Sequence, residues 1–532
     1  MIFYILMISV IFSQLPEGYD LDRNTRLNRF ENISYNKLNS NSIFDIRQID
    51  ESYLLISTGS GLSYINIYDD NPDSINFGSF NKNLVPLPRG GAPALVVKDN
   101  IIAISGIVDT QAVTGLELMG TGISYSMDYG ENWDYISQPI DSIPSSGNYH
   151  TVQWGGQDIR VLSVTTEINN ISYDLSIGEN YIYAASWAGG IRRYGPLDAV
   201  QKNWQIIPLP MDSDTNLIGG SILDEDYELN PNDPDNGGNH NHKGFSVLVL
   251  NDTIWAGTAY GINKGIIESD CITWTKHYTS EYYNGNLSGN WVIGFFNQKF
   301  NELKERIWAI TWSGGNGNER HALSYTDDGG SNWETTYPSG YSEKVYNLYS
   351  YQNKIWAASE SGLYTSLDGD HWEKYSDKKI DSITGEQIFA ESVLAVFFEN
   401  EWLWLGTSDG LGIITNNNRF MTVHRYWEPA NQLSVYPNPF LMDEYNQSNG
   451  VGHVRFIFTN SSNHSGMIDI FDFTMDKVIQ LNSYSMVNES ESEIIWNGKN
   501  EYGNRVANGI YFCRLSLNNN YYWTKLAIVK SK

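Results

Sequence analysis

The chain repeats one pattern of apolar and polar positions, and its clearest copy runs from Lys354 to Tyr375. Within it, Ile355 to Ser359 is a short run of apolar, aromatic and small residues between turn formers, which predicts a strand. Ser361-Gly362 predicts a tight turn, because glycine adopts positive φ angles that a side chain resists. Leu363 to Ser366 predicts the returning strand, and a second turn follows it. The pattern therefore predicts two hairpins in one antiparallel sheet.

The same pattern recurs with its turn residues aligned. The tightest spacing between copies is 48 residues, from position 307 to 355 and again from 355 to 403. A period near this value, with four strands in each unit, is typical of β-propeller blades. The sequence therefore predicts an all-β protein whose main domain, residues 15–430, is a seven-bladed β-propeller. The seven copies occupy residues 54–61, 101–105, 182–189, 254–261, 307–314, 355–362 and 403–410.

Aromatic residues occur at two places in the pattern, inside the strands and in the turns. We predict that the strand tryptophans pack between neighbouring blades. The residues just before the repeated glycine are expected at one end of the central channel, where aromatic rings and carboxylates suit a sugar or a peptide. The alternative is that they only pack against neighbouring turns. The strand positions are Trp255, Trp308, Trp356 and Trp404, and the turn positions are Trp187, Tyr260, Trp312, Glu360 and Asp409.

The charge of the chain limits its partners. Lys and Arg number 34 against 62 Asp and Glu, which gives a formal net charge of −28 at pH 7. A nucleic-acid backbone and an anionic membrane surface are therefore disfavoured. The two cysteines, Cys271 and Cys513, fall in different predicted domains and have no metal-binding spacing, so we interpret both as ordinary small side chains.

The first residues of the chain form an apolar run that is too short to span a bilayer. Its length and its small residue Ser13 suit a secretory signal peptide, residues 1–14, with cleavage near Gln14. The alternative is a first strand of the fold. No second long apolar segment follows, so we predict no transmembrane segment. These features favour export.

Four predicted turns contain an Asp followed by a Trp, as in the segment Ser126-Met-Asp-Tyr-Gly-Glu-Asn-Trp133. They resemble the Asp-box (BNR) repeat of sialidases and many other secreted propellers. The resemblance implies a structural role, in which the Asp accepts backbone N–H bonds in a tight turn and the Trp packs between hairpins. A sialidase would also need an arginine cluster and a Tyr/Glu nucleophile pair, whereas the arginines here are few and no Arg-Ile-Pro type motif precedes the first Asp box. The four pairs are Asp128 and Trp133, Asp270 and Trp274, Asp328 and Trp333, and Asp368 and Trp372.

A long acidic connection, residues 224–244, separates the third and fourth copies of the pattern. Loops of this length inside compact folds are often functional. Asp224, Asp226, Asp233 and Asp235 offer the hard oxygen donors that calcium accepts, although they lack the register of an EF-hand loop. They are candidate calcium ligands, and no other cofactor is expected. The alternative is a solvated loop without a metal.

The last part of the chain, residues 431–532, changes character. It opens on Tyr436-Pro-Asn-Pro-Phe440 and carries Trp496, glycines at 498, 503 and 509, and Tyr511. This spacing resembles the FlgD-type immunoglobulin-like domain and the related C-terminal sorting domain of type IX (Por) secretion. The glycines suit a turn-rich connection, and the two aromatic residues suit the core of a sandwich. The resemblance implies recognition by secretion machinery, passage through the periplasm, and a secreted or outer cell-surface location.

Three functions compete for this chain. We favour a non-catalytic protein whose propeller binds a glycan, a polymer or a protein, because no catalytic constellation emerges from the sequence. The first alternative is an extracellular glycoside hydrolase or lyase, which would need paired carboxylates about 5–10 Å apart at the channel. The second is a scaffold that uses the propeller as a platform for partners. The sequence itself identifies no ligand.

Overall fold

The computed structural model confirms the predicted all-β class. The described part of the chain is almost entirely strands and turns, with two short 3₁₀ helices, η3 (Pro234–Asn236) and η4 (His240–His242). The described residues are 38–51, 53–67, 76–80, 86–112, 115–145, 147–213, 216–217, 227–268, 271–277, 287–301, 304–315, 317–375, 388, 390–399, 401–415, 420–424, 433–442, 453–460, 466–482, 485–488 and 491–529.

In these residues, seven sheets are each built on four strands that are consecutive in sequence and pair antiparallel. The fourth sheet carries the additional short strand β15 (Asn216–Leu217). The first three sheets contain β1 (Ile43–Gln48), β2 (Tyr53–Thr58), β3 (Gly61–Asn66) and β4 (Asn76–Ser79); β5 (Leu95–Lys98), β6 (Ile101–Ala112), β7 (Gly115–Ser126) and β8 (Asp134–Ile136); and β11 (Ser172–Ile177), β12 (Ile182–Ser186), β13 (Gly190–Gly195) and β14 (Asn203–Ile207). The next four contain β17 (Gly244–Leu250), β18 (Thr253–Thr258), β19 (Gly261–Ile267) and β20 (Ile272–His277); β21 (Trp291–Lys299), β22 (Glu305–Trp312), β23 (Ala322–Thr326) and β24 (Glu334–Thr336); β25 (Val345–Tyr351), β26 (Lys354–Ser359), β27 (Gly362–Ser366) and β28 (Glu373–Lys374); and β29 (Ala395–Glu399), β30 (Trp402–Thr407), β31 (Gly410–Thr415) and β32 (Phe420–His424).

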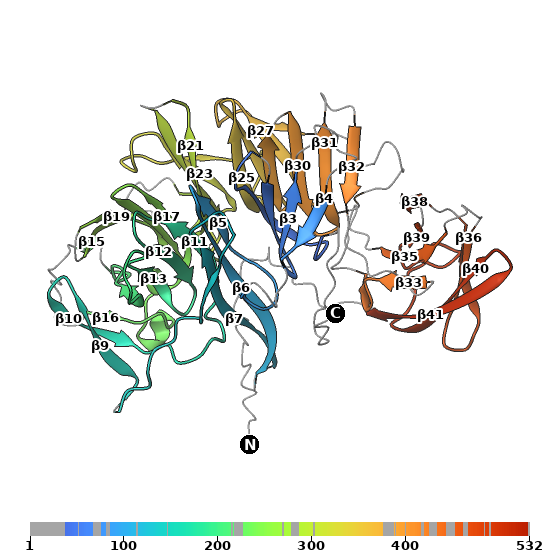
Figure 1. Ribbon diagram of the computed structural model, residues 1–532, viewed down its shortest axis with the longest axis horizontal. Coiled ribbons are helices and arrows are strands. Elements are labelled where there is room, and N and C mark those ends of the chain that lie inside the picture. Colours follow the sequence, from blue (N-terminus) through green and yellow to red (C-terminus); the bar gives the residue numbers. More distant parts are fainter. Residues whose placement is uncertain are drawn as a thin grey trace, which may run out of the picture.

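The first strands of these sheets form a closed series of contacts. Going round, β1 contacts β5, then β11, β17, β21, β25 and β29 follow in turn, and β29 contacts β1 again. Figure 1 shows the blue first sheet beside the orange last one, although they lie at opposite ends of this part of the chain. The arrangement is β-propeller-like, and closure of the ring leaves only short edges.

Ring closure depends on apolar packing between the first and the last sheet. Leu54 and Ile56 of β2 share one buried cluster with Trp404 and Leu411 of β30 and β31. The repeated tryptophans act in the same way elsewhere, because Trp255, Trp308, Trp356 and Trp404 are all buried, as the sequence predicted. The apolar positions of the repeated pattern are therefore the residues that pack between neighbouring sheets.

Polar side chains complete the backbone hydrogen bonding of the inner strands. Asp174 of β11 accepts a bond from the Val247 N–H of β17 at 3.0 Å. Ser246 of β17 donates from its hydroxyl to the Val292 carbonyl of β21 at 2.7 Å. An edge strand without such partners would leave backbone groups open to another chain. These bonds therefore join neighbouring sheets as well as protecting their edges.

Two additions interrupt the regular pattern. In the second sheet a long hairpin extends beyond the repeated pattern, because β6 and β7 stay paired as far as Ala112 and Gly115. A further sheet, which the pattern did not predict, contains β9 (Tyr149–Trp154), β10 (Gln157–Leu162) and β16 (Glu228–Leu229). Trp154 and Ile159 of this sheet join the buried cluster of the third and fourth sheets.

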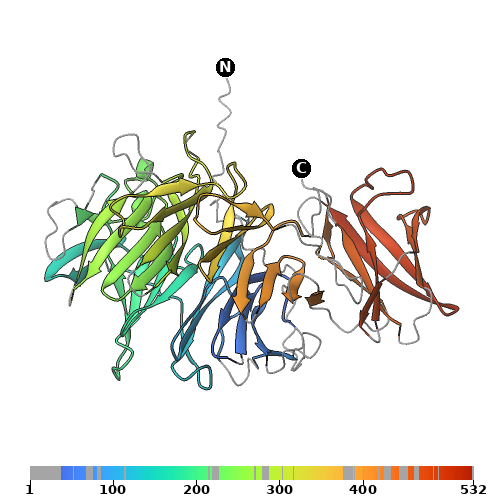
Figure 2. The ribbon, with the colours of Figure 1, turned by 90° about the horizontal axis from the view of Figure 1, so that it is seen from above.

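The C-terminal part forms two sheets that face each other across one apolar core (Figure 2). Trp496 and Tyr511 lie in this core with their ring centroids 6.1 Å apart, and each donates a hydrogen bond to a nearby backbone carbonyl. The predicted role of this aromatic pair as core anchors is therefore confirmed. One sheet contains β33 (Leu433–Tyr436), β35 (Val454–Thr459), β39 (Glu491–Trp496) and β38 (Ser485–Asn488), and the other contains β34 (Phe440–Leu441), β41 (Asn520–Val529), β40 (Gly509–Leu517), β36 (Gly466–Phe471) and β37 (Lys477–Leu481).

No helix in the described ranges is long and apolar enough to cross a membrane. The two cysteines, Cys271 and Cys513, are buried free thiols in separate parts of the fold, as expected from the sequence.

Candidate ligand-binding face

The turn between the second and third strands of a sheet is held by a hydroxyl group at the end of the second strand. In the fourth sheet, Thr258 donates to the Gly261 carbonyl at 3.1 Å and accepts from the Tyr260 N–H at 3.0 Å. Thr407 and Gly410 repeat the first bond in the seventh sheet at 2.8 Å. Gly261 and Gly410 have φ angles of 99° and 111°, a region that favours glycine. These bonds give the turns a repeated shape at one end of the ring.

Trp187 lies in such a turn and belongs to an aromatic cluster that crosses three sheets. Its ring centroid is 5.1 Å from that of Phe245 and 6.0 Å from that of Trp291. Phe245 is buried, whereas Trp187 and Trp291 are half-buried. The Lys243 ammonium lies 4.8 Å from the centre of the Trp187 ring, which is a cation–π contact. We call Trp187, Phe245 and Trp291 the aromatic cluster.

Tyr260 lies half-buried in the next turn of the ring, among acidic side chains. Burial raises the pKa of its phenol, and the negative charges of Asp212 and Glu319 raise it further. Asp212 is itself fixed, because it accepts backbone N–H bonds from residues 240 and 241 at 3.0 and 2.8 Å. Glu319 accepts the Gly314 N–H at 2.6 Å. The phenol therefore sits beside carboxylates that are held in place.

The other three predicted turn residues have different environments. Trp312 is buried, and its indole N–H donates to the Val345 carbonyl at 3.1 Å. Glu360 is exposed and accepts the Lys344 N–H at 3.2 Å. Asp409 is fully buried and contacts Arg455 of the sandwich, as described below. The structure thus leaves Trp187, Tyr260 and Glu360 accessible at this end of the ring.

Sequence reasoning missed Phe245 and Trp291, which lie outside the repeated strand-and-turn segment. Both stand at the start of an inner strand, β17 or β21. The available signal was an aromatic residue at the start of several inner strands. Phe44, Tyr173 and Tyr346 occupy comparable positions in β1, β11 and β25.

A polar network lies at the centre of the ring. Asp45 of β1 pairs with Arg47 at 2.8 Å and accepts a bond from the Asn347 amide of β25 at 3.1 Å. Asp174 of β11 interacts with the charges of both Asp45 and Arg47. Because β1, β11 and β25 belong to the first, third and sixth sheets, the network links sheets that are not neighbours.

Burial raises the pKa of both carboxyl groups in this network. The pKa of Asp174 reaches about 7, chiefly through burial, while backbone N–H bonds and Arg47 oppose the rise. The pKa of Asp45 is raised by burial against the opposing effect of Arg47. Each carboxylate bonds to groups of the fold, since Asp174 accepts the N–H groups of Leu175 and Val247. These contacts indicate that the two carboxyl groups join the sheets, rather than act as a nucleophile or a general base.

The described Asp-box turns connect the third and fourth strands of their sheets, at the opposite end from the aromatic cluster. In the fifth sheet, Asp328 accepts bonds from the backbone and side-chain amides of Asn332 at 2.9 and 2.7 Å. These bonds, followed by one from Thr326, lower the pKa of Asp328 to about 2. In the equivalent turns, Asp128 accepts a bond from Asn132, and Asp368 accepts one from His371. Of the paired tryptophans, Trp133, Trp274 and Trp333 are buried and Trp372 is half-buried. Asp270 lies outside the described residues.

The acidic connection is partly packed against the ring. Asp233 pairs with Lys243, and this contact lowers the pKa of Asp233. Within the described ranges, no group of three or more His, Cys, Asp or Glu side chains could hold a metal ion. Asp224 and Asp226 lie outside the described residues, so the calcium site formed with Asp233 and Asp235 stays a prediction.

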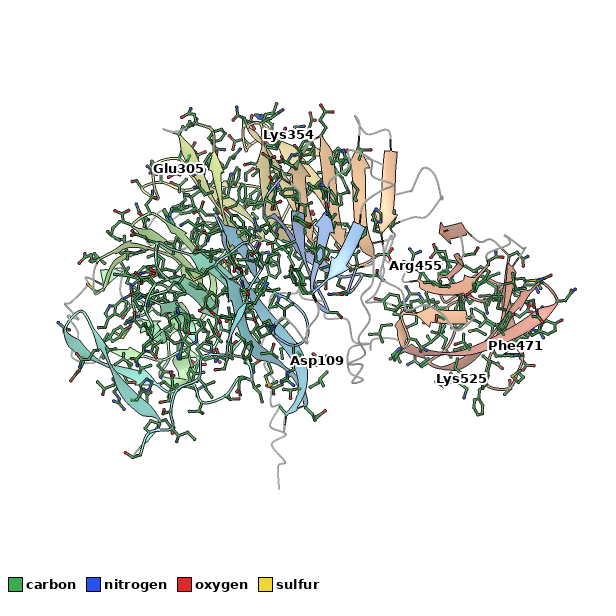
Figure 3. All side chains as sticks on the ribbon, viewed as in Figure 1. Asp109, Glu305, Lys354, Arg455, Phe471 and Lys525 are labelled. Carbon is green, nitrogen blue, oxygen red and sulfur yellow. The ribbon has the colours of Figure 1, made fainter. Side chains whose placement is uncertain are left out.

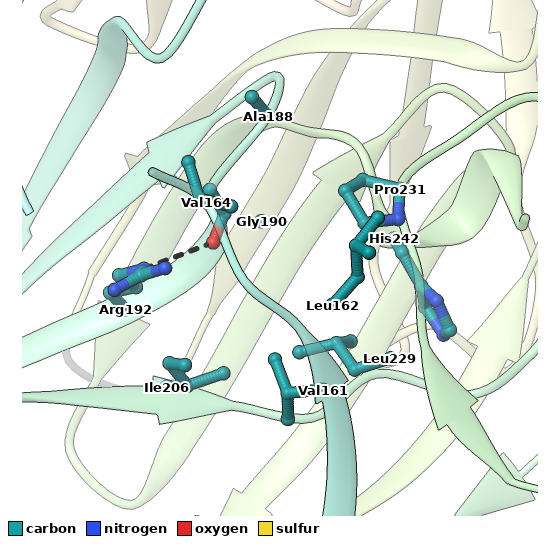
Figure 4. A pocket seen from close by; sticks show the side chains of 11 residues that line it. Val161, Leu162, Val164, Ala188, Gly190, Arg192, Ile206, Leu229, Pro231 and His242 are labelled. Atoms are coloured by element: carbon teal, nitrogen blue, oxygen red, sulfur yellow. Dashed lines mark hydrogen bonds between the residues drawn. The ribbon is translucent and has the colours of Figure 1, made fainter. Parts of the chain in front are cut away.

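Two cavities in the described part of the chain are small. The first has a volume of about 10 Å³ beside Arg192, whose guanidinium donates to the Gly189 carbonyl at 3.3 Å (Figure 4). The second has about 220 Å³ between the sixth and seventh sheets and is lined in part by Trp356 and Phe398. Ligand pockets usually enclose roughly 300–1,000 Å³. These cavities are therefore small for a small-molecule ligand. The open faces of the molecule are better candidates, and they suit a larger ligand.

The closed series of sheets and the sandwich define an all-β, β-propeller-like protein with a C-terminal β-sandwich. No protein-family model matches the chain, and no curated protein matches it. Solved structures do match. PorZ of Porphyromonas gingivalis, described as an essential bacterial surface component of the type-IX secretion system, is 13% identical, with a TM-score of 0.39 over 92% of this chain and 66% of that chain.

Two further solved structures match with low TM-scores. AztD of Citrobacter koseri is 9% identical, with a TM-score of 0.33 over 72% of this chain and 86% of that chain. Dimeric latent PorU of P. gingivalis is 11% identical, with a TM-score of 0.15 over 75% of this chain and 35% of that chain. None of these proteins is close enough to transfer a ligand or a partner to this chain.

Proposed function

We propose that this protein is an exported, non-catalytic binding protein that takes a glycan, another polymer or a protein at one end of a seven-bladed β-propeller. The observation that carries the proposal is the half-burial of Trp187, Trp291 and Tyr260 at that end. Half-buried aromatic rings keep one side free for stacking while the other side is fixed by packing. The fixed carboxylates beside Tyr260 can accept hydrogen bonds from hydroxyl or amide groups of a ligand.

The remaining parts of the proposal concern export. Residues 1–14, which lie outside the described residues, act as the signal peptide, and the sandwich at 431–532 acts as an immunoglobulin-like sorting domain recognised by secretion machinery. Its support is the Trp496 and Tyr511 spacing together with the core position of both rings. The mature protein is then secreted or held at the outer cell surface.

The experiment compares wild-type protein with Tyr260→Ala and Trp291→Ala on arrays of immobilised glycans and proteins. Tyr129→Ala is the matched control, because Tyr129 is an exposed aromatic residue in an Asp-box turn at the other end of the ring. We expect each ring-end variant to lose at least tenfold in affinity for the retained ligand, while the control binds as wild type. Equal binding by all four proteins would contradict the proposal, and so would the absence of any retained ligand. Thermal melting identifies a variant that has lost its fold.

The competing function is a hydrolase or lyase that uses the central carboxylates. Asp45 and Asp174 interact electrostatically and lie on the inner strands of the first and third sheets, which is the observation that favours it. In that case Asp174→Asn would abolish product release without weakening substrate binding. The binding proposal instead expects no product from any retained polymer.

A further inference from the structure

The outward face of one sandwich sheet carries an exposed group of aromatic rings. Along β40 and β41 the side chains alternate, so that core residues such as Leu515 and Leu526 are buried while their neighbours in sequence point outward. Tyr521 and Trp523 are 64% and 50% exposed, whereas the core aromatic residues Trp496 and Tyr511 are buried. The face contains Phe471, Phe512, Arg514, Tyr521, Trp523 and Lys525, and we call it the outer sandwich face.

The strand register brings these residues together in rows. Phe471 pairs with Phe512, and Phe512 pairs in turn with Lys525. In the next row, Arg514 pairs with Trp523. The rings of Phe471 and Trp523 have centroids 5.8 Å apart with an interplanar angle of 34°. The rows therefore form a nearly continuous aromatic surface across β36, β40 and β41.

A fixed carboxylate, that of Asp469, lies buried beneath this surface. Asp469 accepts bonds from Arg514 at 2.6 Å and from the Gln480 amide at 2.7 Å. Although burial opposes them, these bonds hold the pKa of Asp469 below its usual range. The Arg514 guanidinium lies 5.0 Å from the ring centre of Tyr521 and 5.6 Å from that of Trp523. Hydrogen-bonding groups are thus held in place between the rings.

The outer sandwich face has no partner within the described chain. The contact between the sandwich and the ring of sheets goes through Arg455, which belongs to the opposite sheet. Figure 3 shows Arg455 on the side of the sandwich nearer the ring and Phe471 on the far side. An exposed aromatic surface of this kind marks an interaction site rather than a core.

We propose that the outer sandwich face is a second binding site and that it takes a polysaccharide chain. Sugar rings have apolar C–H faces that stack on aromatic side chains, and their hydroxyl groups can bond to Arg514 and Gln480, which the buried Asp469 holds in place. A flat face suits an extended polymer, which needs no enclosing pocket. This site would be additional to the ring-end site and independent of it.

The extent of the face favours a polysaccharide over a protein. A standard protein interface uses roughly 20–30 residues on each side. The outward positions of β36, β37, β40 and β41 supply far fewer, and the rings occupy only three rows across the strands. The local charges also differ from those of the whole chain, because Lys477, Arg514 and Lys525 accompany one Asp469. The site is therefore expected to bind neutral chains, and acidic chains as well.

The test is affinity electrophoresis of the full chain in gels that contain a polysaccharide, with β-glucan, xylan and mannan as neutral probes and polygalacturonate and alginate as acidic probes. We expect wild-type protein to be retarded by at least one probe. Trp523→Ala should weaken that retardation about tenfold or more, and Trp523→Phe should restore most of it, because the phenyl ring still stacks. Tyr502→Ala is the matched control, since Tyr502 is 78% exposed in the same domain but lies off this face.

Each outcome decides the proposal. Retardation that depends on Trp523, whether by neutral or by acidic chains, supports it and identifies the class of polysaccharide. No retardation by any probe would overturn it, and so would retardation that Trp523→Ala leaves unchanged. Capture of a protein through Trp523, without any polysaccharide binding, would also overturn it in favour of a protein partner. Tyr260→Ala should leave the Trp523-dependent part of the retardation unchanged, so the ring-end proposal can fail separately.

Discussion

Asp174 joins two neighbouring sheets and also belongs to the central polar network of the ring. It accepts the Val247 N–H of the next sheet, and it lies beside Asp45 and Arg47 at the centre. Burial makes its charged form unfavourable, so the pKa of about 7 is a consequence of its position. A carboxyl group that is protonated near neutral pH can still accept the backbone bond.

We expect Asp174→Asn to change how stability depends on pH. Between about pH 4 and pH 7 the folded protein keeps a proton on Asp174 that the unfolded chain releases, so the free energy of unfolding falls as the pH rises. The asparagine amide keeps an acceptor for the Val247 N–H and has no charge to lose. At pH 8 the variant should be more stable than wild type, by on the order of 4 kcal/mol.

The measurement is urea denaturation at several pH values, with Asp252→Asn as the control for an exposed carboxylate. Asp45 also has a raised pKa and should contribute a slope in the same direction. A wild-type stability that rises from pH 4 to pH 7, or a variant with an unchanged slope, would be inconsistent with a buried Asp174.

For single residues, the sequence predicted those roles that depend on local spacing along the chain. The buried strand tryptophans and the bonded Asp-box carboxylates follow from the repeat itself. It could not predict the environment of Asp409, because Arg455 is 46 residues away in the other domain. It also missed the Asp45 and Asp174 network, whose members meet only when the ring closes.

At the scale of elements, the strands were predictable because each copy of the pattern contains its own turn signals. The β9 and β10 hairpin was missed because residues 149–162 contain no copy of the strand-and-turn pattern. The short β16 could not be predicted either, since it pairs in parallel with β10 across a long separation in sequence. Local signals therefore define the sheets, whereas the additions depend on long-range packing.

The repeated tryptophan positions should dominate the stability of the elements. Trp308 is fully buried, and its indole N–H donates to Gln298 at 2.8 Å. We expect Trp308→Ala to cost about 3–5 kcal/mol through lost apolar contact, an unfilled cavity and a broken hydrogen bond. Chemical denaturation measures this cost, with Tyr341→Ala, an 81% exposed aromatic position, as the control. Equal stability of the two variants would show that Trp308 does not stabilise the packing between sheets.

At the scale of the whole molecule, one buried ion cluster joins the ring to the sandwich. Arg455 donates to Glu493 at 2.6 Å within the sandwich and to Asp409 of the seventh sheet at 3.0 Å. All three side chains are almost completely buried. Removing one member of such a cluster leaves charge in a poorly solvated place.

We expect Arg455→Met to destabilise the protein by about 3–5 kcal/mol and to loosen the contact between the domains. In calorimetry the ring and the sandwich should then unfold in more widely separated transitions than in wild type. Arg505→Met, at an exposed position of the sandwich, is the control. An Arg455→Met profile identical to wild type would mean that the cluster does not hold the domains together.

The ring end is expected to bind its ligand without converting it. The most direct measurement incubates the full chain with the glycan that it retains and follows both binding and newly formed reducing or unsaturated ends over time. We expect retention that depends on Tyr260 and Trp291, with an unchanged polymer. Product that accumulates with time and disappears in Asp174→Asn would contradict the claim and establish an enzyme.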